Sequence, residues 1–449
     1  MNLDAGCADW RRGDPAGALR HFEAATAAAD HLLAHRARLD RLCAWIALGL
    51  PDEALARREA DALRGGPITV EARLVLVVAQ ALLRAMPACR RAVADLDSDP
   101  VPDGLGFVHL VNAGVVLLEA NDVVGALAYF DRAGSAAATP EARALVAQTV
   151  GGSWGPAVLT MNRGIAVGVQ ALQAAGDAER AALFRRALGT LDAARAALAE
   201  VRAPDRLLAD ARHNLGAVHL WRGWRARDPE ALEAALRNHW AALGLYRRRP
   251  ELRRQAGSQW RALGLCYRAS GDTSGDARAQ ACFDRAERLL VEAGDARALA
   301  ELDLAEAALR LDAEPDAAVA LAVPAALFLD AQRYQLAGAA ARDLWSDGPG
   351  EDALDDALAA ARRAGRGDLA AALVVWRRLG GTTQFEQEGP LPVAGPDASL
   401  LTPPPRIRGV SEPLEPYVIA AARRYHVPET DLVGPTTIDL LGAGRAAGG

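Results

Sequence analysis

The chain is 449 residues long, and 51% of its residues are hydrophobic while only 5% are aromatic. Long runs of alanine, leucine and arginine favour packed helices over strands, which argues against a β-rich enzyme. All 51 residues counted as Lys+Arg are arginine, which excludes enzymes that need a phosphate-loop, Schiff-base or kinase lysine. The net charge of -6 argues against a general nucleic-acid binder, although a local basic patch would still allow one.

The cysteines and the first acidic residues bear on where the protein works. Five cysteines are widely spaced and form no CxxC pair, which indicates neither a disulfide framework nor a structural zinc site. Asp4 and Asp9 interrupt the apolar run that a signal peptide needs, and the longest uncharged stretch, residues 144–162, is interrupted by polar residues and glycines. We therefore expect a cytoplasmic protein without a membrane segment, a metal or a cofactor.

From the N-terminus onward, small and aromatic residues recur at the spacing of two-helix repeats of about 34 residues. Glycine and alanine allow the two helices of a hairpin to approach each other, while aromatic side chains fill the space between hairpins. The residues that carry this pattern are Ala18, Phe22, Ala25, Asn112, Gly114, Ala126, Phe130, Ala133, Trp260, Leu263, Gly264, Tyr267, Ala279, Phe283 and Ala286. Turns are expected at Gly13–Asp14 and Asn121–Asp122, and weaker units around Trp45, Asn162 and Gly216.

An irregular join interrupts the repeats at residues 134–156. It contains Thr139–Pro140 and then the glycine and proline cluster at 151–156, which should break helix on both sides. The segment is interpreted either as a connecting loop or as a hinge.

Past residue 310, the pattern is still helical but less repetitive. Residues 311–380 are predicted to form a helical C-terminal cap, with a kink at Pro324. Residues 381–449 are rich in proline and glycine and are predicted to be a linker or tail. Within this tail, residues 413–425 could form a short helix, which would persist only when docked on another surface.

The repeat units resemble tetratricopeptide repeats, and the resemblance covers residues 1 to about 310. It implies an all-α fold, a right-handed α-α superhelix of stacked hairpins, and a function in binding. Residues 321–334 are similar to repeat regions of actinobacterial proteins that are linked to caspase-like CHAT peptidases. The peptidase domain itself, with its catalytic His and Cys, has no counterpart in this sequence.

Motifs that could carry catalysis or bind a metal are weak. Cys282 follows Gln280 and Ala281 as in part of a caspase signature, but the next residues differ, and a buried structural cysteine is the better interpretation. His31 and His35 could face one metal, although no third ligand is near them in sequence. Asp355–Asp356 point in different directions on a helix. We expect no enzymatic activity.

The resemblance also assigns a candidate binding groove. The first-helix positions that face the concave side in tetratricopeptide proteins are apolar here: Leu39, Cys43, Ile46, Val108, Val111, Val115, Val158, Met161 and Ile165. An exposed apolar groove typically receives an amphipathic helix or an extended peptide. A shifted repeat frame, or a tightly coiled array, would instead bury these residues.

A second candidate surface combines aromatic residues with arginines. Its members are Trp221, Trp224, His239, Trp240, Tyr246, Arg222, Arg225, Arg247, Arg248, Arg249, Arg253, Arg254, Arg261 and Arg268. Arginine beside tryptophan suits the recognition of acidic or aromatic side chains. The alternative is that the tryptophans pack between repeats and the arginines form a solvated face.

These patterns predict a non-enzymatic scaffold or regulatory adaptor that recruits a protein partner, with a CHAT-type peptidase or another defence component as its setting. One alternative is a sensor that changes shape on binding a small peptide. Another is a nucleic-acid-binding helper that uses the arginine cluster. The helix at Tyr417–Tyr425 is also expected to dock in the apolar groove and to compete with the partner.

Overall fold

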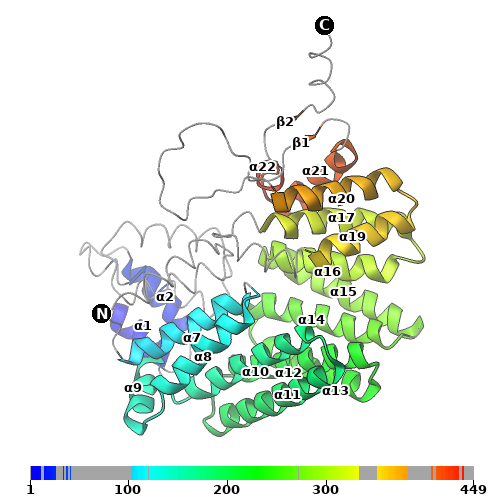
Figure 1. The fold of residues 1–449 in the computed structure, drawn as a ribbon. Helices are drawn as coiled ribbons and strands as arrows, with labels where there is room; N and C mark the ends of the chain where they lie inside the picture. The colour runs from blue at the N-terminus through cyan, green and yellow to red at the C-terminus, as the bar shows by residue number, and fades with distance from the viewer. Residues whose placement is uncertain are drawn as a thin grey trace. The chain divides into compact units, whose positions relative to one another are not determined.

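The computed structural model is helical and divides into two units, Met1–Gly294 and Asp295–Gly449 (Figure 1). The parts of the chain that the structure describes are residues 2–11, 15–26, 103–119, 121–150, 152–271, 273–332, 351–382, 406–407, 411–433 and 437–438, with single positions 34, 37, 38 and 41. The first unit ends at Gly294. The predicted repeat array, which ends at about residue 310, also includes the next helix, Ala296–Arg310.

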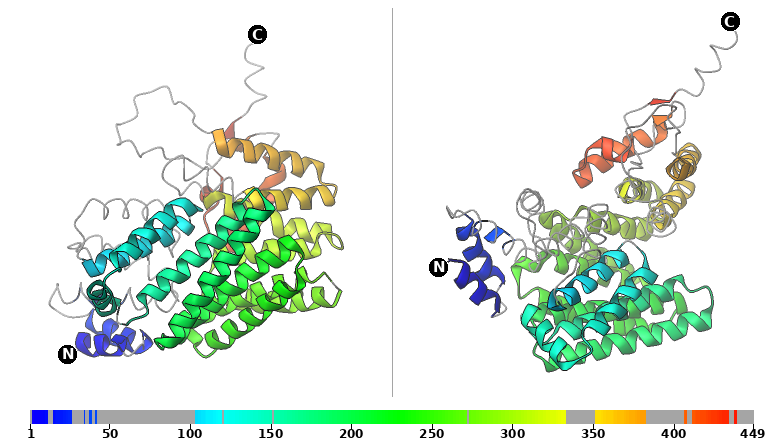
Figure 2. Two further views of the ribbon diagram at one scale, coloured as in Figure 1. Left: turned by 60° about the horizontal axis from the view of Figure 1, so that its bottom comes forward. Right: turned by 60° about the vertical axis from the view of Figure 1, so that its left-hand side comes forward.

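The first unit consists of helices that mostly pack on the next helix of the chain. Its described helices are α1 (Asn2–Arg11), α2 (Pro15–Ala25), α7 (Asp103–Glu119), α8 (Val123–Ala136), α9 (Pro140–Val150), α10 (Gly155–Gln173), α11 (Asp177–Glu200), α12 (Asp205–Ala226), α13 (Pro229–Tyr246), α14 (Arg253–Ala269) and α15 (Thr273–Ala293). A 3₁₀ turn at Pro250–Leu252 precedes α14. Helix α9 packs mainly on α7, and α10 packs on α8 as well as on α11. Hairpins form between α7 and α8, α10 and α11, α12 and α13, and α14 and α15 (Figure 2). This is the predicted all-α array of helical hairpins.

Each hairpin closes where a glycine of one helix faces a large side chain of the next. The aromatic pairs are Gly6 with Phe22, Gly114 with Phe130 and Gly264 with Phe283. A Cβ at Gly6 would lie 2.5 Å from the Phe22 ring, closer than any real contact, so the glycine is required for the approach of the helices. Phe22, Phe130 and Phe283 are all fully buried. The spacing of small and aromatic residues therefore predicted the packing of these hairpins correctly.

The predicted turn at Asn121–Asp122 is confirmed, whereas the predicted break at 134–156 is only partly correct. Asn121 has a φ of 64°, and Asp122 caps α8 by accepting a hydrogen bond from the Gly125 N–H at 2.9 Å. The join is not a loop, because Pro140 begins helix α9. Proline suits this first helical position because it has no N–H to leave unbonded.

The second unit is also helical. Its described elements are α16 (Ala296–Arg310), α17 (Pro315–Ala331), α19 (Glu351–Arg363), α20 (Gly367–Thr382), a 3₁₀ turn at Glu412–Leu414, α21 (Glu415–Tyr425) and α22 (Glu429–Leu432). Two residues each form β1 (Arg406–Ile407) and β2 (Thr437–Ile438), a short parallel pair that the sequence did not predict. Helix α17 continues through Pro324 and is buried from Ala322 to Ala331.

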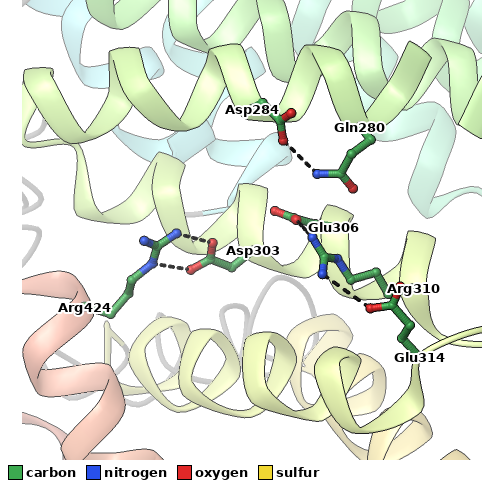
Figure 3. A network of polar contacts seen from close by, with 7 residues as sticks. All are labelled: Gln280, Asp284, Asp303, Glu306, Arg310, Glu314 and Arg424. Carbon is green, nitrogen blue, oxygen red and sulfur yellow. Dashed lines mark hydrogen bonds and ion pairs between the residues drawn. The ribbon is translucent and has the colours of Figure 1, made fainter. Parts of the chain in front are cut away.

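The segment that contains α21 folds onto this unit and is not a free tail. Arg424 donates to Asp303 of α16 through Nη2 at 2.8 Å and Nε at 3.1 Å (Figure 3). Tyr425 donates to the same carboxylate at 2.7 Å, and its ring lies 4.6 Å from that of Phe328 on α17. The expected short helix is therefore present, with a docking place on α16 and α17 in place of the predicted apolar groove.

Within the described part of the chain, no helix is long and apolar enough to cross a membrane.

Candidate binding site

A cleft of about 1040 Å³ lies at the edge of the first unit where α12 ends, α13 begins and α14 ends. These three helix ends meet because consecutive helices run antiparallel. The residues that line the cleft are Leu220, Trp221, Gly223, Trp224, Arg225, Arg227, Pro229, Leu232, Glu233, Leu236, Leu265, Cys266, Arg268, Ala269 and Ser270. We call it the tryptophan cleft.

The floor of the tryptophan cleft is apolar, and its rim is aromatic and cationic. Leu220, Leu232 and Cys266 are buried and belong to one hydrophobic cluster with the half-buried Leu236 and Leu265. On the rim, the side chain of Trp224 is 66% exposed, and Arg225 and Arg227 are exposed beside it. A large aromatic side chain left in water next to an apolar depression is typical of a binding anchor.

A buried polar network joins the same three helices further along their axes. His239 Nδ1 lies 3.0 Å from the amide oxygen of Gln259, and the Gln259 amide nitrogen lies 2.6 Å from His213 Nδ1. An amide oxygen accepts and an amide nitrogen donates, so His239 carries its proton on Nδ1 and His213 accepts on Nδ1.

The network lies two helical turns from the cleft on each helix. Seven residues separate His213 from Leu220, His239 from Leu232 and Gln259 from Cys266, which is about 10 Å at 1.5 Å per residue. The network thus fixes the register of the helices that shape the cleft.

Both histidines of the network are neutral at ordinary pH. Burial, together with the neighbouring His213, lowers the pKa of His239 to about 3, and burial also lowers the pKa of His213. His239 occupies the position that a phenylalanine fills in other hairpins, because its ring packs on Gly216 as Phe283 packs on Gly264. The prediction that His239 belongs to the arginine and tryptophan surface is therefore wrong, because its side chain is fully buried.

Tyr246, another predicted member of that surface, is also buried. Its hydroxyl donates to Asp210 of α12, and burial followed by the Asp210 charge raises its pKa well above the usual value. Tyr246 therefore ties α13 to α12 and is not available to a partner.

Trp240 is 42% exposed but serves mainly to pack α13 on α14. Its ring meets that of Trp260 edge to face at 5.3 Å, and its indole N–H donates to the Tyr267 hydroxyl at 3.3 Å. The Arg285 guanidinium lies 4.8 Å above the Trp260 ring. At this position, the interpretation of a tryptophan as a repeat-packing residue fits the structure better.

The remaining residues of the predicted arginine and tryptophan surface separate into two places. Trp221, Trp224 and Arg268 line the tryptophan cleft, whereas Arg247–Arg249 follow the last turn of α13. Helix α13 has 18 residues, so its two ends are roughly 25 Å apart. The two groups therefore do not form one continuous surface, and Arg261 lies half-buried on α14 between them.

The predicted apolar groove is largely occupied by packing. Val111 is 8% exposed and Met161 is 5% exposed, and each belongs to a core cluster of its hairpin. Val108, Val115, Val158 and Ile165 are half-buried against these clusters. The prediction of an open groove is thus wrong for Val111 and Met161, because their side chains point between helices. Leu39, Cys43, Ile46 and the unit around Trp45 lie outside the described residues.

Groups with catalytic or metal-binding potential are sparse in the described residues. No cluster of three His, Cys, Asp or Glu side chains there could hold a metal ion, and His31 and His35 lie outside the described part. Cys282 is buried, and burial raises its pKa to about 11. Asp355 accepts a 2.9 Å bond from Arg377. None of these features assembles a reaction centre.

Sequence reasoning missed the residues that make the floor of the cleft. Leu232 and Leu236 of α13, and Leu265 of α14, follow ordinary helical spacing and have no distinguishing signal of their own. An antiparallel arrangement of α12, α13 and α14 would nevertheless have placed them beside Trp221 and Trp224, because it brings the end of α12 next to the start of α13.

Comparisons with known proteins give the following results. No protein-family model matches the chain, and no curated protein matches it. Among solved structures, the chain is similar to a Rap protein complexed with Competence and Sporulation Factor, at 13% identity and a TM-score of 0.35, over 76% of this chain and 95% of that one. It is also similar to the apo form of RapI, at 10% identity and a TM-score of 0.29, over 74% and 99% of the two chains.

Proposed function

We propose that the protein is a non-enzymatic scaffold or regulatory adaptor, and that it holds a segment of a partner protein in the tryptophan cleft. The observation that carries this proposal is the exposed Trp224 beside the apolar floor formed by Leu220, Leu232 and Cys266. Tryptophan and arginine around a desolvated pocket dominate the energetics of protein interfaces. A helical repeat array supplies a rigid frame for such a surface.

The chemistry of the lining supports binding rather than catalysis. Burial raises the pKa of the Cys266 thiol to about 12, so this sulfur stays protonated and is a poor nucleophile. Glu233 forms an ion pair with Arg237 at 2.8 Å. The apolar floor and the cationic rim would bind a segment that has an apolar anchor residue.

The setting of the interaction is a further part of the proposal. The similarity of residues 321–334 to repeat regions linked to CHAT peptidases makes a peptidase-containing regulatory or defence system the context that we propose. The same cleft would also accept a free peptide, as expected of a sensor. The experiment below separates a protein partner from a peptide by the size of the captured species.

The proposal is tested by site-specific photo-cross-linking in the native organism. A benzoylphenylalanine replaces Trp224 in one strain and Val124 in another; Val124 is a matched control because it is apolar, 78% exposed and outside the cleft. We expect a protein that cross-links from position 224 and not from position 124. The proposal is refuted if position 224 captures nothing, or the same set of species as position 124.

A further inference from the structure

A second pocket lies on the other side of the end of α12. It has a volume of about 530 Å³ and lies between the first turns of α11 and the last turn of α12. Its lining is Asp177, Arg180, Ala181, Phe184, Arg185, Arg222, Arg225, Ala226 and Asp228. We call it the arginine pocket, because four of its residues are arginines.

Two of these arginines are engaged in holding the fold. Arg180 pairs with Asp177 at 2.5 Å and donates to the Ala174 carbonyl at 2.7 Å. Arg222 donates to Asp228 at 2.7 Å. Both aspartates of the pocket are therefore already matched by a guanidinium.

Asp228 is committed in a further way. It caps α13 by accepting bonds from the Glu230 and Ala231 N–H groups, both at 3.1 Å. The bond from Ala231 is the main cause of its lowered pKa, and the charge of Arg222 adds to it. Asp228 thus stays ionised and bound in place, and does not compete for the other arginines.

The other two arginines of the pocket have no such engagement. No hydrogen bond or ion pair joins Arg185 or Arg225 to another residue in the part of the chain that the structure describes. Both side chains are exposed, and both line the pocket. Each guanidinium group carries a planar fork of N–H donors that matches a carboxylate.

Arg225 lines the arginine pocket and the tryptophan cleft together. A segment that crosses the end of α12 would therefore meet the apolar floor on one side and the two arginines on the other. We propose that the partner segment carries an Asp or Glu beside its apolar anchor, and that Arg185 and Arg225 bind this carboxylate. The inference rests on the proposed function and names the chemistry of its partner.

The charges around the pocket favour a single carboxylate over a polyanion. Asp177 and Glu179 lie in the first turn of α11, and Asp228 and Glu230 lie at the start of α13. Arg180 and Arg222 balance the two aspartates, but Glu179 and Glu230 would repel a nucleic-acid backbone, which binds best to a surface of uniformly positive charge. Arg185 and Arg225, which both line the pocket, are the two arginines left to pair with an anionic group.

The test is selection of a displayed random dodecapeptide library on the full-length chain. The baits are the wild type, Trp224→Ala, the double variant Arg185→Gln with Arg225→Gln, and a control double variant, Arg247→Gln with Arg248→Gln, which removes exposed arginines at the far end of α13. We expect peptides that need Trp224 and are enriched in Asp or Glu. Changing that acid to its amide should weaken binding to the wild type about tenfold, but leave binding to the Arg185/Arg225 variant unchanged.

The outcomes separate the two proposals. Peptides that need Trp224 but show no acidic enrichment would overturn this inference and leave the proposed function standing. If no selected peptide depends on Trp224, both proposals fail. The inference is also overturned if inorganic phosphate, titrated alone, binds through Arg185 and Arg225 as tightly as the acidic peptides, because the pocket would then be a phosphate site.

Discussion

Replacing His239 with phenylalanine should remove a large part of the acid sensitivity of the first unit. The folded pKa of His239 is about 3, against an ordinary value of 6.5. Because the folded pKa is depressed, the unfolded chain binds more protons, and stability is lost as the pH falls below 6.5 towards 3. The 1.5 pH units between 6.5 and 5.0, at about 1.4 kcal/mol per unit, give a loss of about 2 kcal/mol at pH 5.

His239→Phe restores the residue that other hairpins place against their glycine, and phenylalanine does not titrate. The change removes the partner of the Gln259 amide oxygen but keeps His213, which lies 2.6 Å from the amide nitrogen. We therefore expect a small loss of stability that is the same at every pH. The decisive quantity is therefore the difference in the free energy of unfolding between about pH 7.5 and pH 5.0. Urea unfolding followed by tryptophan fluorescence measures it.

In His239→Phe, this pH-dependent difference should be about 2 kcal/mol smaller than in the wild type. His426→Asn is the control, because it removes an exposed histidine at a φ of 55°, which asparagine tolerates. If His239→Phe and the wild type lose the same stability on acidification, the buried neutral histidine is not the source, and the reasoning is refuted.

Three further predictions concern packing, docking and the cleft. Phe130→Ala should lower the free energy of unfolding by about 3–5 kcal/mol in denaturant titrations, while Val124→Ala on the same helix should change it by less than about 0.5 kcal/mol. Asp303→Asn should increase hydrogen exchange in the docked segment 411–433, because Arg424 loses its carboxylate partner; unchanged exchange would show that this ion pair does not hold the segment. Trp224→Ala should leave the melting temperature within about 2 °C of the wild type, and a larger drop would mean that Trp224 supports the fold.

The local packing of the hairpins could be predicted from sequence because it depends on residues close together in the chain. Gly264 and Phe283 lie on consecutive helices, and the absence of a side chain at Gly264 makes room for the Phe283 ring. The same reasoning predicts that Gly216 faces a large side chain. It does not predict which one, because a histidine, His239, stands where other hairpins have a phenylalanine. Its polar partner Gln259, and the His213 that Gln259 contacts in turn, come from two other helices.

The candidate site could be predicted only in part. Trp221, Trp224 and Arg268 were named from sequence, since arginine beside tryptophan is an uncommon combination on a helical surface. Arg185 was not, because it lies near the start of α11, 40 positions before Arg225, and joins the site only through the antiparallel packing of α11 on α12. The docking of Tyr425 on Asp303 was equally hidden, because it joins residues more than a hundred positions apart.

The central claim is that a partner protein binds at the tryptophan cleft, and hydrogen–deuterium exchange tests it most directly. Exchange is measured on the full-length chain with and without the partner identified by cross-linking. Protection should appear in residues 220–236 and 265–270, which line the cleft. Protection confined to residues 108–115 and 158–165, with none at the end of α12, would contradict the claim and return the binding surface to the valine-rich face of α7 and α10.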